Sequence, residues 1–95
     1  MNSPYEWDED KDDRNWRAHG VAFAEAVKVF DDPGAVEEYD AEHSNDEESR
    51  YSRIGFVGTR PLFVVFTVRE EKIRIIHARK ADRIMEKIYA KHQTG

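Results

Sequence analysis

Cysteine is absent from this 95-residue chain, and so are long apolar runs. Without cysteine the chain forms neither a disulfide framework nor a thiolate-ligated zinc site, and nothing in it requires an oxidising compartment. No stretch approaches the ~20 apolar residues of a membrane span, and the acidic start MNSPYEWDEDKDD lacks the basic and apolar regions of a secretory signal. These absences predict a cytoplasmic protein with no membrane partner.

The sequence also lacks the short motifs of common catalytic and cofactor sites. It contains no Walker loop, no G-x-G-x-x-G and no Ser/His/Asp elbow. Its acidic segment at residues 40–47 has neither EF-hand spacing nor a histidine pair, so a solvated loop is a better interpretation than a metal site. We therefore expect no cofactor and no bound metal.

The length and composition predict one small folded domain. A chain of 95 residues has room for a single core, so we expect residues 1–95 to form one domain. Only 39% of the residues are hydrophobic, but they are clustered, mostly in the second half of the chain. This clustering favours a folded domain with polar loops over a disordered chain.

The charge of the chain is divided between its two parts. Residues 1–49 carry four Lys/Arg against 16 Asp/Glu, a net charge of −12, whereas residues 50–95 carry 11 against four, a net charge of +7. A basic region of this kind favours a polyanion or an acidic protein as partner. The alternative is that the two parts fold together and compensate each other's charge, since charge determines association more than fold.

The first third of the chain predicts a short strand and two helices. Tyr5-Glu6-Trp7 alternates as a strand does, although three residues are a weak signal. Asp8 is suited to capping a helix that runs to about His19, and Gly20 is suited to ending it. Apolar residues at positions 23, 26, 27 and 30 predict a second short helix, which an Asp-Asp-Pro-Gly turn ends.

The second half of the chain predicts an antiparallel three-stranded meander. β-branched and aromatic residues fill Arg50–Val57, Leu62–Val68 and Ile73–Arg79, with turns between them. The middle strand is nearly all apolar, as expected of a central strand buried on both faces, and Gly55 is a candidate β-bulge. Val36–Tyr39 would be a short fourth strand at most.

A C-terminal helix completes the predicted fold. Ile84 and Ile88, with Met85 and Tyr89 beside them, predict a helix over residues 81–93 that packs against the sheet. The predicted fold class is therefore α+β, with two N-terminal helices, an antiparallel sheet of three to four strands and a C-terminal helix.

The second hairpin predicts which residues share a face of the sheet. A loop centred on Glu70-Glu71 pairs positions whose numbers sum to 141, so that Thr67 lies opposite Arg74 and Val64 lies opposite His77. One face would then be apolar, with the basic residues 77 and 79 at its end, and would carry the helices. The other face would mix apolar and basic residues as nucleic-acid surfaces do: Phe63, Val65, Thr67, Arg69, Lys72, Arg74, Ile76 and Lys80.

A series of short segments resembles one protein family in order and spacing over about nine tenths of the chain. The segments are Tyr5-Glu6-Trp7-Asp8 with Lys11, Asn15, His19-Gly20-Val21, Phe23, Glu25-Ala26, Val29 to Pro33, Glu48 to Tyr51, Ile54-Gly55, Leu62 to Val65, Thr67 to Arg69, Arg74 to Ala81, Glu86 and Tyr89. With these residues the chain resembles the BrnT toxins, small ribonucleases of bacterial type II toxin–antitoxin systems that are related in fold to RelE. Ala18 stands where the family usually has Lys, Ala22 where it has a capping Ser, and His77 where Ser is common.

The resemblance implies a biological setting. It implies a small RelE-like domain that cleaves RNA in the cytoplasm, inhibits growth and is neutralised by a BrnA-like antitoxin. The ribbon-helix-helix part of that antitoxin would bind DNA, so that the complex represses its own operon and the toxin meets DNA only through the antitoxin.

RNA cleavage without a metal ion needs a base for the 2′-hydroxyl proton, cations for the phosphate and a proton donor for the leaving 5′-oxygen. Arg69, Arg74 and Arg79 suit the phosphate, because guanidinium is a planar fork that stays charged. A single strand-end arginine is more often a solvated charge that discourages aggregation. Three of them within eleven residues, in a chain that resembles a ribonuclease family, favour phosphate binding.

The acid and base have several candidates. His77 titrates near neutrality and suits either role, although a histidine on an apolar face is more often a packed core residue. Glu48 and Glu86 are alternative bases, and Tyr89 is a candidate proton donor or stacking partner for an RNA base. Each is also a common kind of surface ion-pair or packing residue. Further candidates for RNA binding are basic residues of the sheet: Arg50, Lys72 and Lys80.

Structural roles are the better interpretation for His19 and Asn15. His19 lies at the predicted C-terminal end of the first helix, where the helix dipole favours an imidazolium and a ring N–H can satisfy a last carbonyl. Asn15 lies one turn earlier on the same helix.

Two functions remain open from the sequence. The first is a metal-independent endoribonuclease toxin, which the three arginines favour. The second is a catalytically weak module that binds its antitoxin and acts in operon autoregulation, which Ala18 and the acidic half favour.

Overall fold

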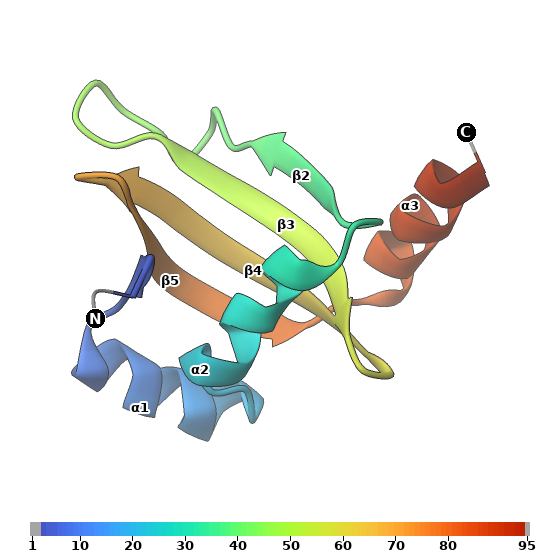
Figure 1. The fold of residues 1–95 in the computed structure, drawn as a ribbon, viewed down its shortest axis with the longest axis horizontal. Coiled ribbons are helices and arrows are strands. Elements are labelled where there is room, and N and C mark those ends of the chain that lie inside the picture. The colour runs from blue at the N-terminus through green and yellow to red at the C-terminus, as the bar shows by residue number, and fades with distance from the viewer. Residues whose placement is uncertain (1–2, 95) are drawn as a thin grey trace.

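The computed structural model describes residues 3–94 (Figure 1). Its elements follow the chain in this order: β1 (Tyr5–Glu6), α1 (Glu9–His19), α2 (Phe23–Ala26), the 3-10 helix η1 (Val27–Asp31), β2 (Val36–Tyr39), β3 (Arg50–Val57), β4 (Arg60–Arg69), β5 (Lys72–Lys80) and α3 (Arg83–Thr94). The strands form one sheet in the order β1-β5-β4-β3-β2. The α+β class is confirmed, and β2, β3, β4 and β5 pair antiparallel with one another in chain order, as predicted.

The prediction of an antiparallel sheet with three to four strands is wrong by one strand. β1 adds a fifth strand that pairs in parallel with β5, with Tyr5 opposite Ile73 and Glu6 opposite Arg74. The backbone N–H of Ile73 also donates to the Pro4 carbonyl over 2.8 Å. Two residues form a strand here because β5 presents an unpaired edge, and the pairing satisfies the backbone groups of both. That pairing joins segments about 70 residues apart, so local patterns do not reveal it.

The first helix has the ends that its sequence predicts. The Asp8 carboxylate accepts from the backbone N–H groups of Asp10 over 2.8 Å and Lys11 over 3.2 Å, which satisfies two donors at the start of α1. Gly20 follows the helix with φ at 68°, a left-handed conformation that glycine adopts without a steric cost. Both caps confirm the predicted boundaries of α1.

The predicted second helix divides into two. α2 covers only four residues, and the 3-10 helix η1 continues it to Asp31. The apolar stripe is as expected, because Phe23, Ala26 and Val29 are all fully buried. A tighter 3-10 turn is common where a helix ends, and here the backbone N–H of Asp32 bonds to the Val29 carbonyl.

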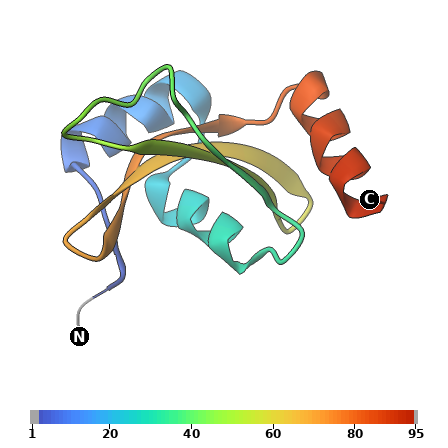
Figure 2. The same ribbon diagram turned by 90° about the horizontal axis from the view of Figure 1, so that it is seen from above.

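The core lies between this second helical segment and one face of the sheet. On that side the central strand β4 buries Leu62, Val64 and Phe66, and β5 adds Ile75 and Ala78. Figure 2 shows α2 and η1 on this side of the sheet, with α1 and the loop at residues 40–49 toward the other side. We call the side with Leu62, Val64 and Phe66 the helix-covered face and the opposite side the open face. The predicted central strand is confirmed, but its burial is nearly complete on one face only.

A β-bulge in β5 changes the predicted faces. The two-residue turn at Glu70-Glu71 gives the predicted pairing from Arg69–Lys72 to Phe66–Ile75, but Val65 then pairs with His77, so Ile76 has no partner. The prediction that Val64 lies opposite His77 is therefore wrong, because an extra residue in a strand turns every later side chain to the other face. Two consequences follow: residues 77 and 79 lie on the open face, and Lys80, opposite Leu62, lies on the helix-covered face.

Gly55, the predicted bulge, is paired regularly with Leu62. A Cβ atom at this position would lie 3.2 Å from the Cβ of Ala35 and 3.4 Å from both Val29 and Asp32. Glycine is needed here because η1 and the following turn pack closely onto β3, and not because the strand is irregular.

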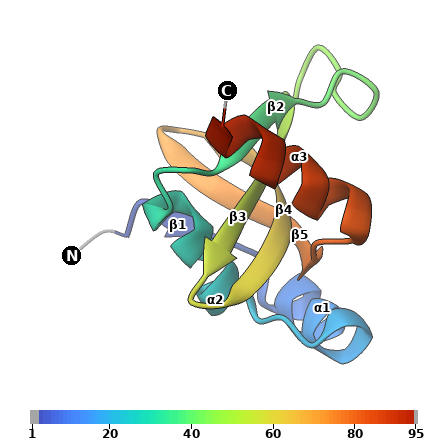
Figure 3. The ribbon, with the colours of Figure 1, turned by 90° about the vertical axis from the view of Figure 1, so that its right-hand side faces the viewer.

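Helix α3 packs mainly against β2 and β3 of the sheet. It begins at Arg83, two residues later than predicted, with the Asp82 carboxylate accepting from the backbone N–H of Met85 over 2.9 Å. It lies beside β2 and β3 (Figure 3), and Met85 and Ile88 line a cavity of about 170 Å³ against the open face. Ile84 is 71% exposed, so the predicted apolar stripe is only partly buried.

Within residues 3–94, no helix has the length and apolar character to cross a bilayer.

Candidate functional site

The open face gathers most of the predicted site residues. Strand alternation and the observed register place Arg74, His77 and Arg79 of β5 on this face, next to the aromatic and aliphatic residues Phe63 and Val65 of β4. All five are partly exposed, whereas their neighbours on the helix-covered face are buried. The face therefore offers cationic side chains over an apolar floor, which suits a nucleic-acid strand.

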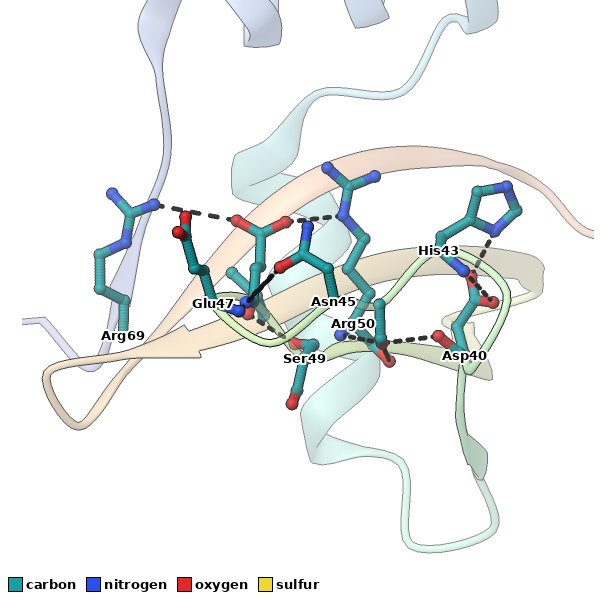
Figure 4. A network of polar contacts seen from close by, with 10 residues as sticks. Asp40, His43, Asn45, Glu47, Ser49, Arg50 and Arg69 are labelled. Atoms are coloured by element: carbon teal, nitrogen blue, oxygen red, sulfur yellow. Dashed lines mark hydrogen bonds and ion pairs between the residues drawn. The ribbon is translucent and has the colours of Figure 1, made fainter.

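One end of the open face is organised by Glu48. Its carboxylate lies 2.7 Å from Nε of Arg50 and 3.9 Å from a guanidinium nitrogen of Arg69, so one acid joins two predicted site residues (Figure 4). The side chain of Asn45 accepts from the backbone N–H groups of Glu47 and Glu48, which holds the loop in this geometry. The structure thus brings Glu48, Arg50 and Arg69 together as predicted site residues.

The surroundings of Glu48 favour its ionised form. The hydrogen bond from Arg50 lowers the pKa of the Glu48 carboxyl, and the charges of Arg69 and of Lys11 on α1 add to this effect. A carboxylate with a lowered pKa is a poor proton acceptor, so this geometry makes Glu48 a partner for the two arginines more than a base.

Arg74 and Arg79 are each held by contacts that leave part of the side chain exposed. Arg74 lies 3.1 Å from the Glu6 carboxylate of β1 and is 27% exposed. Arg79 lies with its guanidinium carbon 4.9 Å from the centre of the Phe63 ring, and its Asp82 contact is longer, at 3.9 Å. The ring orients the planar guanidinium without using its N–H donors, so these remain free for phosphate oxygens.

His77 lies between these two arginines along β5. Its ring meets the ring of His19 edge to face, with the centroids 4.9 Å apart. Burial lowers the pKa of His77, and the nearby His19 and Arg79 lower it further. A neutral imidazole at pH 7 can accept a proton, so the surroundings suit His77 to the role of base.

Three predicted site residues lie away from this group, and a fourth, Lys72, lies on the open face at its loop end, opposite Arg69. Lys80 points by register to the helix-covered face. Glu86 is exposed beside a hollow on α3, and among residues 3–94 it has no described contact with the three arginines. Tyr89 donates its hydroxyl to Asp32 over 2.9 Å and packs on Phe56, which is a structural arrangement.

The acidic part of the chain supplies most partners of the sheet arginines. Six arginines on β3, β4 and β5 form ion pairs, and all but Arg79 pair with an acid from residues 1–49. The acids involved are Glu6, Glu25, Glu37 and Glu48. Intramolecular compensation, the second interpretation of the charge asymmetry, is therefore observed at these positions.

Sequence analysis missed a group of basic residues on α1. Lys11, Arg14 and His19, together with Asn15 and Ala18, line a cleft against β5. The other four residues follow Lys11 by three, four, seven and eight positions, which is the spacing of one helical face. This signal is present in the sequence, but the many acids of the same helix obscure it. Asn15 does have the predicted structural role, whereas His19 also contacts a site residue.

Asn15 fixes α1 onto β5. Its side-chain N–H₂ donates to the carbonyls of Val21 and Ala78 over 2.9 and 2.8 Å, and its oxygen accepts from the Ala78 N–H over 3.1 Å. A buried amide with three partners positions the helix closely, and through it the basic residues of the cleft.

Within residues 3–94 no group of three or more histidine or acidic side chains is placed to hold a metal ion.

A comparison with family models identifies the chain. The model described as "Ribonuclease toxin, BrnT, of type II toxin-antitoxin system" matches residues 7–84, a segment that runs from Trp7 through β5 into the start of α3. This segment contains Glu48, the arginines of the open face and His77, and it ends before Glu86 and Tyr89. A comparison with curated proteins finds no match. The match covers far more than half of the sequence and confirms the resemblance of its segments: the chain belongs to the BrnT family of ribonuclease toxins of type II toxin–antitoxin systems.

Proposed function

We propose that this protein is a metal-independent endoribonuclease that cleaves single-stranded RNA on the open face of its sheet. Membership of the family implies an RNA target and an antitoxin partner. The observation that carries the proposal is the β5 bulge, which turns His77 and Arg79 onto the same face as Arg74. A proton acceptor between two phosphate ligands is the arrangement that RNA transesterification needs.

The reaction uses the 2′-hydroxyl of the RNA as nucleophile. Neutral His77 takes the hydroxyl proton as the 2′-oxygen attacks phosphorus, while Arg74 and Arg79 stabilise the growing negative charge on the phosphate. The bond from phosphorus to the 5′-oxygen breaks, and the leaving oxygen takes a proton from water. The products are a 2′,3′-cyclic phosphate and a free 5′-hydroxyl.

Glu48, Arg50 and Arg69 bind the RNA strand beyond the cleaved bond. Arg69 is 56% exposed and contacts Glu48 only at 3.9 Å, so it can exchange this weak ion pair for a phosphate oxygen. Arg50 is held more tightly at 2.7 Å and keeps Glu48 in place. In this proposal Glu48 positions the two arginines and is not the base.

The antitoxin is proposed to be BrnA-like, with a ribbon-helix-helix part that binds operator DNA in the cytoplasm. It would inhibit the toxin by covering the open face, so the same arginines that bind RNA would lie under the antitoxin. DNA would be contacted through the antitoxin, and the complex would repress its own operon. Saturating antitoxin should therefore abolish RNA cleavage, and unchanged cleavage in the complex would refute inhibition by occlusion.

Cleavage of a single-stranded RNA by the purified toxin in EDTA tests the proposed chemistry. We expect cleavage at full rate, with products that carry a 2′,3′-cyclic phosphate. A strict requirement for Mg²⁺, or products with a 3′-hydroxyl, would contradict the mechanism. His77→Gln in the same assay should lose activity while it keeps RNA affinity, since glutamine cannot accept the proton.

A second candidate function is a catalytically weak module that binds the antitoxin. The ion pairs of Arg50, Arg69 and Arg74 with Glu48 and Glu6 favour it, because paired cations are less available to phosphate. This function predicts tight antitoxin binding and operator repression by a toxin that cleaves no RNA in any buffer.

A further inference from the structure

A cleft between α1 and β5 borders the open face. It has a volume of about 230 Å³, below the ~300–1,000 Å³ of typical small-molecule pockets, and so is suited to a small group. Lys11, Arg14 and His19 line it from α1, and His77 with the bulged Ile76 lines it from β5. Ala18, on the same helix face, adds only a methyl group and leaves the cleft open.

The wall of the cleft is basic and contains no acid. Lys11, Arg14 and two imidazoles line it, and no Asp or Glu does; Asp8 and Glu48 interact with Lys11 from outside the wall. Among the ion pairs described for residues 3–94, none involves these four side chains; Arg14 bonds only to the Asp10 carbonyl, over 3.3 Å. This contrasts with the sheet arginines, each of which has an acid beside it. Basic side chains that converge on one cleft without a close ion pair attract an anion from solution.

We propose that the α1–β5 cleft binds a second phosphate of the RNA, the one next to the phosphate held by Arg79. The proposal rests on the proposed function, because His77 belongs both to the catalytic group and to the cleft wall. His77 and Arg79 are two residues apart on β5, which separates their backbones by about 6.6 Å. A strand whose cleaved phosphate lies at Arg79 therefore passes His77 and reaches the cleft within one nucleotide step.

The chemistry of the wall favours phosphate over other anions. Arg14 offers a guanidinium fork, Lys11 an ammonium group, and each of the two imidazoles a ring N–H, which together suit a group with several acceptor oxygens. The substrate class is then an RNA of at least three nucleotides, with two phosphates bound at once. A dinucleotide would occupy the Arg79 site alone.

The test compares non-cleavable 2′-O-methyl oligonucleotides with one or two phosphates. Arg14→Ala should weaken binding of the trinucleotide about tenfold. It should also reduce the slope of log association constant against log salt concentration by about 0.7, which is the contribution of one single-strand phosphate contact. Its binding of the dinucleotide should match that of the unmodified protein. Arg17→Ala is the matched control, because Arg17 lies on the same helix but pairs with Asp13 outside the cleft.

A second variant tests for a gain of RNA binding. Ala18→Lys adds a cation to the cleft wall and should raise the salt slope for the trinucleotide by about 0.7 with the dinucleotide unchanged. Thermal melts of each variant control for folding. Inorganic phosphate alone, titrated against the His19 and His77 imidazole signals in NMR, should shift both signals, and Arg14→Ala should reduce the shifts.

Three results would overturn the cleft proposal. The first is an Arg14→Ala protein whose salt slope equals that of Arg17→Ala. The second is equal weakening of both oligonucleotides, which would place the main phosphate in the cleft. The third is a response to free phosphate without any effect on the trinucleotide, which would make the cleft a site for small anions only. A protein that binds neither oligonucleotide would instead refute the proposed function itself.

Discussion

Two basic regions, one at the loop end of the open face and one in the α1–β5 cleft beside it, differ in how closely acids pair with them. At the loop end, Arg50 and Arg69 share the carboxylate of Glu48, and Arg74 nearby pairs with Glu6. At the α1–β5 cleft, no ion pair within 4 Å is described for Lys11 or Arg14 in residues 3–94, although the charge of Lys11 acts at longer range on Asp8 and Glu48. The acids of the first half of the chain therefore form close ion pairs in the first region, whereas they act on the cleft only at longer range.

The difference shows what each region can contribute to binding. Paired guanidinium groups are held in fixed directions, but part of the energy of binding a phosphate is lost in displacing the acid. Cations without a close ion pair bind an anion without having to displace an acid, and they are less ordered beforehand. The net charge of the chain, −5, does not reveal a local positive cleft.

The largest effect is expected on stability, from loss of the hydrogen bonds that hold α1 on β5. Asn15→Ala deletes three buried hydrogen bonds that join α1 to Ala78 and Val21, and should lower the free energy of unfolding by about 3–5 kcal/mol. Urea unfolding measures this loss. Asn45→Ala, which removes an amide from an exposed loop, is the control and should cost far less. An Asn15→Ala protein of unchanged stability would mean that α1 is positioned by other contacts.

Next in size is the effect of Arg79→Ala on cleavage. Loss of its guanidinium should reduce the rate about a hundredfold, equivalent to ~2.7 kcal/mol of transition-state stabilisation, with little change in stability because the side chain lies on the surface. Growth inhibition in a host without antitoxin should disappear. Lys80→Ala changes the adjacent cation on the helix-covered face and should leave cleavage intact. A folded Arg79→Ala protein that remains fully toxic would remove this residue from the site.

Glu48→Gln removes the carboxylate that pairs with Arg50 and Arg69, so that these two arginines lose their acid partner as in the cleft. Without the carboxylate, Arg50 and Arg69 become available, so we expect RNA to bind several-fold more tightly, with a steeper salt dependence. Steady-state kinetics should give a lower KM and an unchanged kcat. If kcat instead falls strongly, Glu48 is the base and the assignment to His77 is wrong.

The smallest effect is the dependence of stability on pH through His77. Burial lowers its pKa in the folded state, so below the unfolded value of about 6.5 the unfolded chain binds more protons and acid favours unfolding. The free energy of unfolding should therefore fall as the pH drops from about 7 toward the folded pKa. His77→Gln should weaken this fall in urea titrations at pH 5 to 8. An unchanged profile in the variant would assign the effect to other groups.

Local features of the fold were predictable because they depend on neighbours in sequence. The caps of α1 at Asp8 and Gly20, the two-residue turn at Glu70-Glu71 and the short strand β2 all follow from residues within a few positions of one another. The BrnT resemblance depended on many short segments in order, and the family match confirms it.

Part of the candidate site was predictable and part was not. Arg69 and Glu48 were expected and do lie together, and Arg74, His77 and Arg79 were expected as a strand-borne set. Glu86 and Tyr89 were candidates on residue type alone, and the position of α3 separates them from the arginines. The basic stripe of α1 was missed because its acids dominate the composition of that helix.

The sequence by itself determined the element types, the hairpin turn and the family, because hydrophobic period, capping and turn residues act over short distances. Only the tertiary structure decided which basic side chains lie on the open face, the surface proposed to bind RNA. The bulge at Ile76 reverses the face of His77 and Arg79, and the packing of α1 on β5 brings His19 to His77 across nearly 60 residues of sequence. Both depend on how the core is filled, since a one-residue change of register moves a whole strand's side chains while its local pattern stays the same.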